Sequence, residues 1–250
     1  MSKTAAPIAL ITGAAQRIGR HLALHLAREG WDIVVHYNSS HSEAETLAEE
    51  IKATGQRAIT LQADLSDSKM VNEMIPNGAE QLGIPNLLIN NASLFEKDQF
   101  GALSAHSFDM HMAINLRAPL LLAEALAKSY ADKTSQTEPG NIINITDQRI
   151  FNPGADFVSY TLSKIGLGAA TRTMAKALAP TLRVNAIAPG PVLKSKHQTD
   201  EDFISECSGT PLGHGTTPEE ICSAVSYILS ARAMTGETIA LDGGQRLDCR

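Results

Sequence analysis

Short runs of apolar, β-branched residues alternate with longer segments of helical periodicity along the whole 250-residue chain. The expected strands are apolar on both faces, which is typical of a parallel sheet covered by helices on both sides. We therefore expect an α/β fold, a single Rossmann-type domain over residues 1–250 with a doubly wound parallel sheet. The expected strands are Ile8–Ile11, Trp31–Tyr37, Ala58–Gln62, Asn86–Asn90, Asn141–Ile145, Arg183–Ile187 and Thr238–Leu241.

Helix-start signals stand between these runs. Ser42-Glu43-Ala44-Glu45 and Thr217-Pro218-Glu219-Glu220 have the spacing of capping boxes, so each predicts the beginning of a helix. Lys133–Gly140 is expected to be an exposed loop. The polar stretch Lys194–Thr216 interrupts the alternation and predicts a mobile flap over a site. The other expected helices are Ile18–Arg28, one from about Asp67, one over about 102–130, and Val158–Leu178.

Composition excludes several classes of protein. The 21 Lys+Arg and 27 Asp+Glu residues give a net charge of -6 without a long basic block, which argues against nucleic acid as a partner. No window approaches the apolar length of a membrane span. The three cysteines form no CxxC pattern and fit a reducing compartment, so we expect a soluble, cytoplasmic protein. His21 and His25 have helical spacing but lack further ligands, so we expect no metal.

The segment between the first strand and the first helix has the character of a nucleotide-binding turn. Gly13 and Gly19 lie in Thr12–Gly19, where a dinucleotide diphosphate contacts helix amides in doubly wound folds. Arg17 stands where the three-glycine pattern would have its middle glycine. A cation there opposes the helix dipole, so it should be matched by an anion such as a phosphate.

The end of the second strand indicates which dinucleotide is bound. NAD enzymes need an acid there for the ribose 2′-hydroxyl, but this chain reads His36-Tyr37-Asn38-Ser39-Ser40, without a carboxylate. A 2′-phosphate is therefore not repelled, and hydroxyl, amide and imidazole donors can bind it. We expect NADPH as cofactor, with His36 and Ser40 among its contacts.

A candidate catalytic group lies in the predicted helix Val158–Leu178. Tyr160 and Lys164 are four residues apart and so share one face of the helix. A nearby ammonium, together with the positive charge of an oxidised nicotinamide, stabilises phenolate and lowers the pKa of a tyrosine toward the working range. Asp147 ends the preceding strand at the carboxyl edge of the sheet, where ligands bind in such folds.

These residues together resemble the short-chain dehydrogenase/reductase family over essentially the whole chain. Seven landmarks occur in the family's order and at its spacing. They are the Thr12–Gly19 loop, Asp64 after the third strand, Asn90-Asn91-Ala92, Asn115, Tyr160-x-x-x-Lys164, Pro189-Gly190 and Asp242-Gly243-Gly244.

The resemblance implies roles for the residues at these positions. Tyr160 would be the proton donor, Lys164 would hold the nicotinamide ribose, and Asn115 would shape its helix to hold a relay water. It also implies assembly through the helix that contains Leu120–Leu126 and the following helix, often as a homotetramer. The residues implied to contact the cofactor are Gly13, Arg17, Ile18, Gly19, Asp64, Leu65, Asn91, Ala92, Tyr160, Lys164, Pro189 and Gly190.

Within this family the chain is most similar to pteridine reductases and dihydromonapterin reductases. Four departures from the general pattern coincide with theirs. In those relatives the matches of Phe95, Ser93 and Arg17 contact the pterin or the cofactor phosphate, and the match of Asp147 partners the tyrosine. The four residues are Arg17, Ser93, Phe95 and Asp147.

The chain also departs from pteridine reductases. Ser39 stands where they carry an Arg for the 2′-phosphate, and Pro191–Lys194 and the short flap differ. The far side of the substrate pocket is therefore expected to differ from that of the pteridine reductases.

The chemistry of position 147 supports a pterin-like substrate independently. A serine would donate a hydrogen bond to a carbonyl oxygen, whereas an ionised Asp147 can only accept one and would repel an oxyanion. An acid there suits reduction of a C=N bond. The alternatives are a carbonyl or 3-oxoacyl reductase of the same family, and a non-catalytic NADP-binding regulator. Asn115, Tyr160 and Lys164 together disfavour the regulator.

Overall fold

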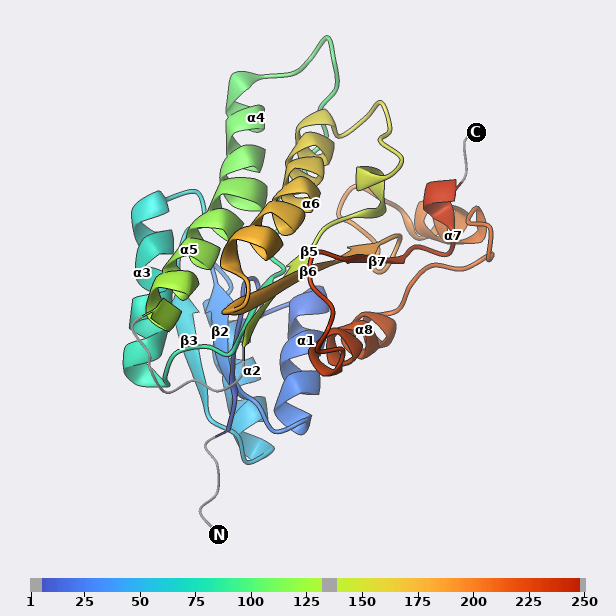
Figure 1. The fold of residues 1–250 in the computed structure, drawn as a ribbon. Coiled ribbons are helices and arrows are strands. Elements are labelled where there is room, and N and C mark those ends of the chain that lie inside the picture. Colours follow the sequence, from blue (N-terminus) through green and yellow to red (C-terminus); the bar gives the residue numbers. More distant parts are fainter. Residues whose placement is uncertain (1–5, 132–138, 248–250) are drawn as a thin grey trace.

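The computed structural model describes residues 6–131 and 139–247, in which seven parallel strands form one sheet. The strand order is β3-β2-β1-β4-β5-β6-β7, so the chain winds outward from β1 in both directions (Figure 1). The expected Rossmann-type α/β fold is confirmed. The strands are β1 (Ile8–Ile11), β2 (Asp32–Tyr37), β3 (Ala58–Gln62), β4 (Leu87–Asn90), β5 (Gly140–Ile145), β6 (Leu182–Pro189) and β7 (Thr238–Leu241).

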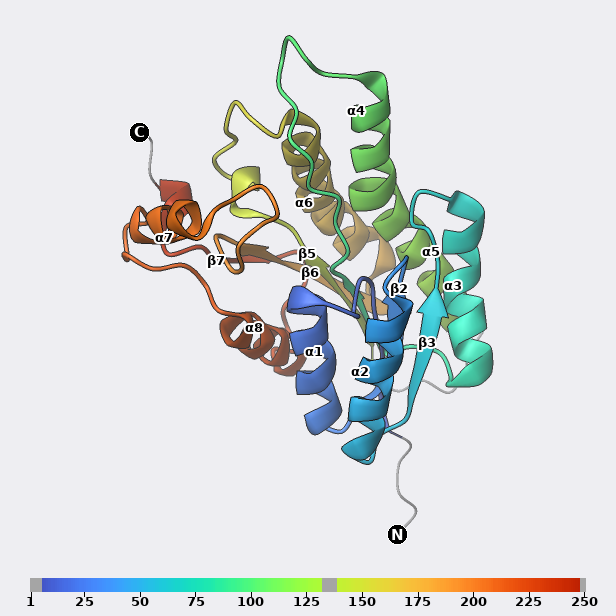
Figure 2. The same cartoon turned by 180° about the vertical axis from the view of Figure 1, so that it is seen from behind.

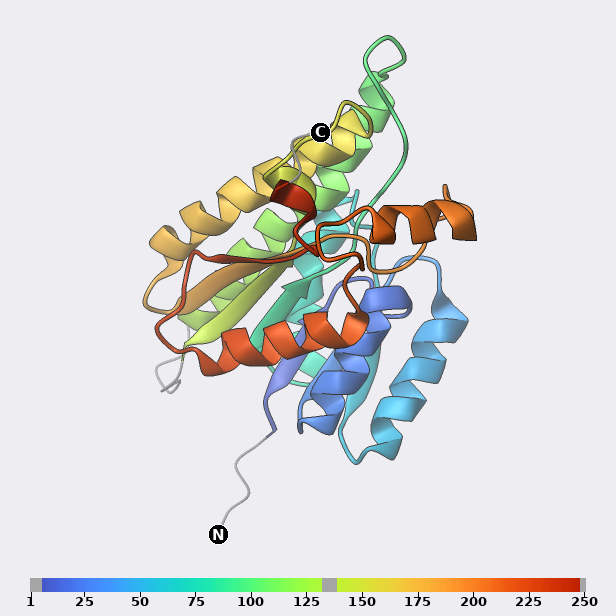
Figure 3. The same cartoon turned by 90° about the vertical axis from the view of Figure 1, so that its right-hand side faces the viewer.

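Helices cover both faces of the sheet (Figures 2 and 3). On one face lie α1 (Arg17–Arg28), α2 (His41–Ala53) and α8 (Pro218–Ser230), whose apolar residues share one core cluster. On the other lie α3 (Ser68–Gln81), α5 (Ala118–Ala131) and α6 (Val158–Leu178), which share the second cluster. The sheet is therefore the middle of three layers.

Strand β1 contributes side chains to the core on both faces of the sheet. Ala9 and Ile11 pack with Leu22 of α1, while Leu10 packs with Leu122 of α5. All five side chains have no exposed surface. Because alternate side chains point to opposite faces, one short apolar strand contributes to both cores. Each buried Leu or Ile contributes roughly 1.5–3 kcal/mol to folding.

The two capping-box predictions have different outcomes. Thr217 and Glu220 form the predicted box, because each side chain accepts from the other's backbone N–H. The box at Ser42 is wrong, since α2 begins at His41 with Ser40 as its N-cap, so Ser42 lies inside the helix. Ser42 donates instead to Glu43, and the Glu45 carboxylate accepts from Thr60 on β3.

The long helix predicted over 102–130 is interrupted. Helix α4 (Ala105–Met112) begins after Ser104, whose hydroxyl accepts the N–H of Ser107. A π-helical turn, Ala113–Arg117, then joins α4 to α5. Such turns widen a helix by one residue and often mark functional sites. Asn115 lies in the middle of this one.

The predicted flap contains a helix that the sequence prediction omits. Helix α7 (Asp200–Ser208) begins with a capping box between Thr199 and Asp202, a spacing that is visible in the sequence. The predicted loop Lys133–Gly140 lies mostly outside the described residues, and Gly140 opens β5. None of the described helices is long and apolar enough to cross a membrane.

Candidate active site

A cavity of about 780 Å³ lies at the carboxyl ends of β1, β4, β5 and β6. The order of strands reverses at β1 and β4, and open α/β sheets bind their ligands in the crevice at such a point. Thirteen of the residues proposed from the sequence line this cavity. They are Gly13, Arg17, Ile18, Gly19, Asn91, Ala92, Ser93, Phe95, Asp147, Tyr160, Lys164, Pro189 and Gly190.

The turn between β1 and α1 is packed too closely to accept side chains at its two glycines. Gly13 has φ +63, and a Cβ there would lie 3.1 Å from the Cα of Ala92. A Cβ on Gly19 would collide with the carbonyl oxygen of Gly13. Gln16, the N-cap of α1, makes no capping hydrogen bond with its side chain, so the first amides of α1 are left for a ligand.

Arg17 is the exposed first residue of α1 and has a left-handed backbone with φ 54. Its guanidinium donates to the carbonyl oxygens of Leu193 and Lys194, at 3.0 and 2.9 Å. Two carbonyl dipoles of the flap thus meet the charge of the guanidinium. Arg17 ties the flap to the edge of the cavity.

His36 does not reach the cavity, and its predicted contact with a 2′-phosphate is wrong. The side chain is 1% exposed, and both ring nitrogens are already used. Nδ1 accepts the N–H of Gly13 at 3.0 Å, so Nε2 carries the proton and donates to the carbonyl of Ala63 at 3.1 Å. Burial lowers the pKa of His36 to about 4. This neutral imidazole supports the turn at Gly13 from behind.

This burial predicts a dependence of stability on pH. In the unfolded chain His36 takes up a proton below pH 6.5, whereas the folded protein resists it down to about 4. We expect the free energy of unfolding to fall by up to about 3 kcal/mol on this account between pH 6.5 and 4, and to be unaffected by it at higher pH.

The measurement is denaturant unfolding of the wild type and His36→Asn between pH 7 and 4, where only the slopes are compared. The variant has a lower free energy of unfolding at pH 7 but no ionisation at this position, so its stability should fall less steeply as the pH is lowered. Parallel slopes would show that His36 is not the group responsible.

The remaining predicted adenosine contacts lie outside the cavity walls. Ser40 is the half-buried N-cap of α2, and its side chain makes no capping hydrogen bond. Asp64 is engaged by the N–H and hydroxyl of Ser66 at 2.8 Å each, and Leu65 is buried. All three lie near the carboxyl ends of β2 and β3 in the chain, beyond the turn at Gly13.

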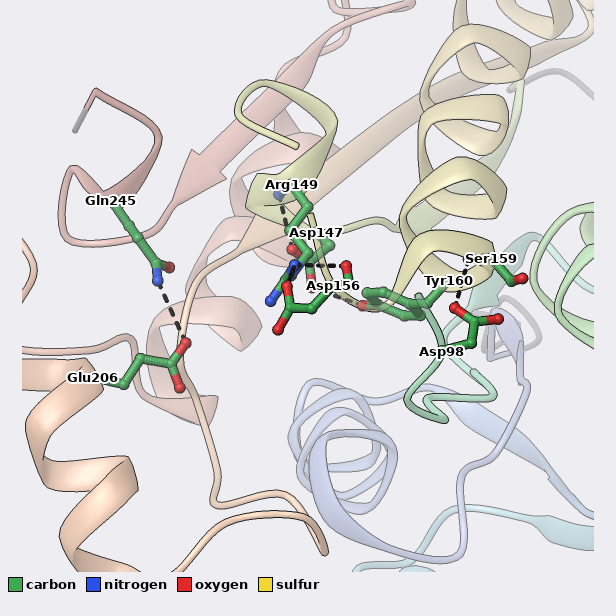
Figure 4. Close-up of polar contacts among 8 residues, drawn as sticks. All are labelled: Asp98, Asp147, Arg149, Asp156, Ser159, Tyr160, Glu206 and Gln245. Atoms are coloured by element: carbon green, nitrogen blue, oxygen red, sulfur yellow. Dashed lines mark hydrogen bonds and ion pairs between the residues drawn. The ribbon is translucent and has the colours of Figure 1, made fainter. Parts of the chain in front are cut away.

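Asp147 and Tyr160 meet at the centre of the site (Figure 4). The Tyr160 hydroxyl donates to Oδ2 of Asp147 at 2.6 Å, while Oδ1 accepts the N–H of Arg149 at 2.8 Å. Lys164 donates to the carbonyl of Ile145 at 2.7 Å, and its Nζ lies 5.7 Å from the centroid of the Tyr160 ring. A strand end and the first turns of α6 hold the three groups together.

The ionisation of this group differs from the expectation. Burial and the Asp147 carboxylate raise the pKa of Tyr160 well above its usual value. Burial also raises the pKa of Asp147 and lowers that of Lys164 to about 8. Among the groups of the protein, burial and Asp147 therefore dominate the pKa of Tyr160, and the predicted lowering by Lys164 with an oxidised nicotinamide stays a prediction for the cofactor complex. Tyr160 is a neutral phenol at neutral pH, the state in which it can donate a proton.

Asn115 lies behind the cavity, 1% exposed, in the π-helical turn. Its Oδ1 accepts the N–H of Leu94 at 2.8 Å, and its Nδ2 donates to the carbonyl of Leu94 at 2.9 Å and to Ser163 at 3.0 Å. The Ser93 hydroxyl also approaches Oδ1 at 3.4 Å. The amide therefore fixes the loop before Phe95 against α6, a support that the sequence does not reveal.

An aromatic cluster forms the next wall of the cavity. Phe95 stacks face to face on Phe157, with centroids 4.3 Å apart and planes at 3°, and contacts Tyr160 edge-on at 4.7 Å. The Arg149 guanidinium lies 5.4 Å from the Phe157 centroid and bonds Asp156 at 2.8 Å. Its positive charge opposes the rise in pKa at Asp147 and Tyr160.

Further cavity residues come from the flap and the C-terminal turn. His197 bonds the carbonyl of Phe95 at 3.1 Å, and Lys196 pairs with Glu96. Glu206 of α7 accepts from Gln198 at 2.6 Å and from Gln245 at 3.3 Å (Figure 4). The sequence reasoning missed Arg149, Phe157, His197 and Glu206, because no local pattern connects them with the site.

The histidines of α1 belong to surface contacts. His25 bonds Ser226 at 2.8 Å, and His21 approaches Glu219 at 3.5 Å, so both face α8. Among residues 6–131 and 139–247, no group of three or more His, Cys, Asp or Glu side chains could hold a metal ion.

Comparison with known proteins agrees with this geometry. Residues 13–246 match a family model described as enoyl-(acyl carrier protein) reductase. The chain is 33% identical over 249 residues to the short-chain dehydrogenase/reductase eriH of Hericium erinaceus, which covers 95% of this chain and 97% of that protein. It is 31% identical over 243 residues to the 3-oxoacyl-[acyl-carrier-protein] reductase FabG of Staphylococcus epidermidis, with 94% and 97% covered.

A solved structure is more similar in sequence. The crystal structure of FolM alternative dihydrofolate reductase 1 from Brucella suis in complex with NADP matches with a TM-score of 0.92 and 42% identity, covering 98% of this chain and 96% of that one. Family model, curated relatives and fold agree over almost the full length. The chain belongs to the short-chain dehydrogenase/reductase family of oxidoreductases.

Proposed function

We propose that this oxidoreductase uses NADPH to reduce a C=N bond of a dihydropterin-like small molecule. The observation that carries the proposal is the buried pair of Asp147 and Tyr160, joined at 2.6 Å on the wall of the cavity. The pair suits a nitrogen heterocycle in two ways. The phenol can give the proton that the C=N nitrogen needs, and the carboxylate can accept a hydrogen bond from a ring N–H.

The cavity has features that fit NADPH. The crowding at Gly13 and Gly19 and the uncapped start of α1 suit a diphosphate. When bound, NADPH supplies the hydride. We propose that Lys164 holds its nicotinamide ribose, that Asn91, Ala92, Pro189 and Gly190 line it, and that Asp64 and Leu65 flank its adenine. Ser40 remains a proposed donor to the 2′-phosphate, and the NADP in the Brucella suis relative supports this choice of cofactor.

The proposed proton path uses only groups of this chain. Tyr160 stays protonated because burial and Asp147 raise its pKa, so its hydroxyl can give a proton to the substrate nitrogen. Asp147, which accepts the Tyr160 hydroxyl at 2.6 Å, is then placed to take a proton from solvent and pass it to the phenolate, and burial raises its pKa in the direction that this step needs. The carbon of the C=N bond gains the hydride and the nitrogen gains this proton, which balances the reduction.

The aromatic wall supports a planar heterocyclic substrate. Phe157 stacks on one face of Phe95, and the two rings line the cavity together. Offset stacking contributes about 0.5–1.5 kcal/mol beyond burial. We propose that Phe95 stacks on the substrate, and that Ser93 and Arg17 contact the substrate or the cofactor phosphate. The name of the Brucella suis relative, an alternative dihydrofolate reductase, is consistent with a pterin ring.

The second candidate is a 3-oxoacyl reductase, which the similarity to FabG favours. Asp147 argues against it, because a carboxylate facing a developing oxyanion is repulsive. A non-catalytic NADP-binding regulator is a third reading, and the hydrogen-bonded Tyr160 argues against that.

The test is to follow NADPH absorbance with purified protein and dihydropterin substrates, namely dihydromonapterin, dihydrobiopterin and dihydrofolate. NADH and an acetoacetyl thioester are the controls. We expect oxidation of NADPH with a pterin but not with the thioester. Turnover of the thioester alone would replace the proposal by the carbonyl reductase. Binding of NADPH with no turnover of either class would favour the regulator.

We also propose a homotetramer that assembles through α5 and α6. Leu120 on α5 and Leu162 on α6 are 38% and 42% exposed in the single chain, which is consistent with a contact at this surface.

A further inference from the structure

The N-terminus of α6 is not capped by its own residues. The N-cap of this helix is Phe157, and Tyr160 is the third residue of its first turn. Phe157 has a left-handed backbone, with φ 51 and ψ 48, and its side chain makes no capping hydrogen bond. The first amides of a helix have no partner within it, so a buried helix start needs acceptors from elsewhere.

Asp98, in the loop after β4, supplies these acceptors. Its Oδ1 accepts the N–H of Ser159 at 3.0 Å, and its backbone carbonyl accepts the N–H of Val158 at 3.3 Å (Figure 4). Its Oδ2 accepts from the Ser107 hydroxyl of α4 at 2.8 Å. Asp98 is 7% exposed and Ser159 is fully buried, so solvent cannot replace this cap.

The same loop carries the aromatic wall of the site. Asp98 follows Phe95 by three residues, and the Phe95 ring contacts both Phe157 and Tyr160. One residue therefore joins the loop of Phe95 to the helix of Tyr160. We propose that Asp98 is a positioning residue, which holds Tyr160 and Phe95 in their reactive arrangement without touching the reacting atoms.

The physical basis is the cost of losing this cap. Without the carboxylate the Ser159 N–H is buried and unpaired, and the left-handed backbone of Phe157 loses a constraint that keeps it in place. Burial raises the pKa of Asp98, but the hydrogen bonds from Ser159 and Ser107 outweigh it and lower the pKa. The carboxylate thus stays charged, which suits the positive end of the α6 dipole.

The first test is the turnover of NADPH by Asp98→Ala and Asp98→Asn with the substrate that the wild type reduces. Misplacing a reacting group by about 1 Å costs on the order of 10²-fold in rate, so we expect a drop in kcat of about 10- to 100-fold for Asp98→Ala. The affinity for NADPH should change much less than kcat, because most of the proposed cofactor contacts lie at the turn after β1 and at the ends of β4 and β6.

Asp98→Asn separates hydrogen bonding from charge. Its amide oxygen can still accept from Ser159, and its NH₂ can donate to the Ser107 hydroxyl, which can accept as well as donate. We expect kcat within about fivefold of the wild type. This small loss would come from the missing attraction between the carboxylate charge and the α6 dipole. An Asn variant as slow as the Ala variant would overturn the positioning role.

The matched control is Thr217→Ala, which removes a cap of the same kind from α8. None of the residues of α8 lines the cavity. We expect this variant to lower the melting temperature by about 2–4 °C while kcat is unchanged. If Asp98→Ala loses only as much activity as Thr217→Ala, the cap of α6 is merely structural and the inference fails.

The inference rests on the proposed role of Tyr160, so a second readout avoids the substrate. Ultraviolet difference spectra isolate the titration of this phenol when the wild type is compared with Tyr160→Phe, and Asp98→Ala with the double variant Asp98→Ala, Tyr160→Phe. Loosening the first turn of α6 exposes the phenol, so its titration should move to lower pH. An unchanged titration would overturn the inference, whereas a failed substrate assay alone would concern only the proposed function.

Discussion

Replacing Tyr160 with phenylalanine is expected to lower the turnover of NADPH by about 10²- to 10⁴-fold, the usual contribution of a general acid. The substitution removes the hydroxyl that donates to Asp147 at 2.6 Å and that we propose protonates the substrate. It keeps the ring, which packs edge-on against Phe95 at 4.7 Å. The measurement is kcat with the dihydropterin that the wild type reduces.

Binding of the cofactor is the control for this variant. The affinity for NADPH, followed by fluorescence, should change less than about threefold, since the phenol is proposed to act mainly in the chemical step. A variant that keeps a tenth or more of the wild-type turnover would contradict the mechanism. The proton would then have to come from another group of the site.

Replacing Asp147 with serine should change the preference between substrates. We expect turnover of a dihydropterin to fall by about 10²- to 10³-fold, a loss of the size seen when one stabilising group is removed from an active site. Turnover of an acetoacetyl thioester should fall much less or should rise, because serine can donate to an oxyanion whereas the carboxylate repels it. The measured quantity is the ratio of kcat/KM for the two substrates.

Asp147→Asn is the matched variant. Asparagine keeps an acceptor for the N–H of Arg149 but cannot hold the exchangeable proton of a carboxyl group. If the raised pKa of Asp147 serves a proton relay, Asn should be as slow as Ser with the pterin. Equal losses on both substrates in Asp147→Ser would refute the nitrogen-specific role.

The strands and most helices follow from periodicity, because the sheet is parallel and buried on both faces. Ile8–Ile11, Ala58–Gln62 and Val158–Leu178 have the bounds that the sequence predicts. Which side chain caps a helix is harder to predict from the sequence. Ser42 fails as a cap because the helix already begins at His41, and Glu45 is held by Thr60 of the neighbouring strand, a contact that only the folded chain creates.

The candidate site shows the same division. Residues at strand ends and on one helix face converge because topology brings the carboxyl ends of parallel strands to one edge, so Gly13, Asp147 and Tyr160 line one cavity. His36 also ends a strand, but its side chain turns inward to Gly13 and Ala63. The partners of His36, the N–H of Gly13 and the carbonyl of Ala63, are distant in the sequence, so the local pattern does not reveal them.

Long-range caps are the part that local sequence cannot indicate. Asp98 and the start of α6 are 61 positions apart along the chain, and neither segment has an unusual pattern. Likewise the left-handed backbone of Phe157 is set by its surroundings, since nothing in its residue type favours it.

Helix α7 has a consequence for how relatives of this protein can diversify. None of its residues is buried, yet Asp202, Phe203 and Glu206 form part of the cavity wall. Substitutions there leave both core clusters intact, so they cost little folding free energy while they reshape the pocket directly. Substitutions in α7 can therefore accumulate and alter this wall of the cavity, and with it the substrate range, before the rest of the scaffold changes.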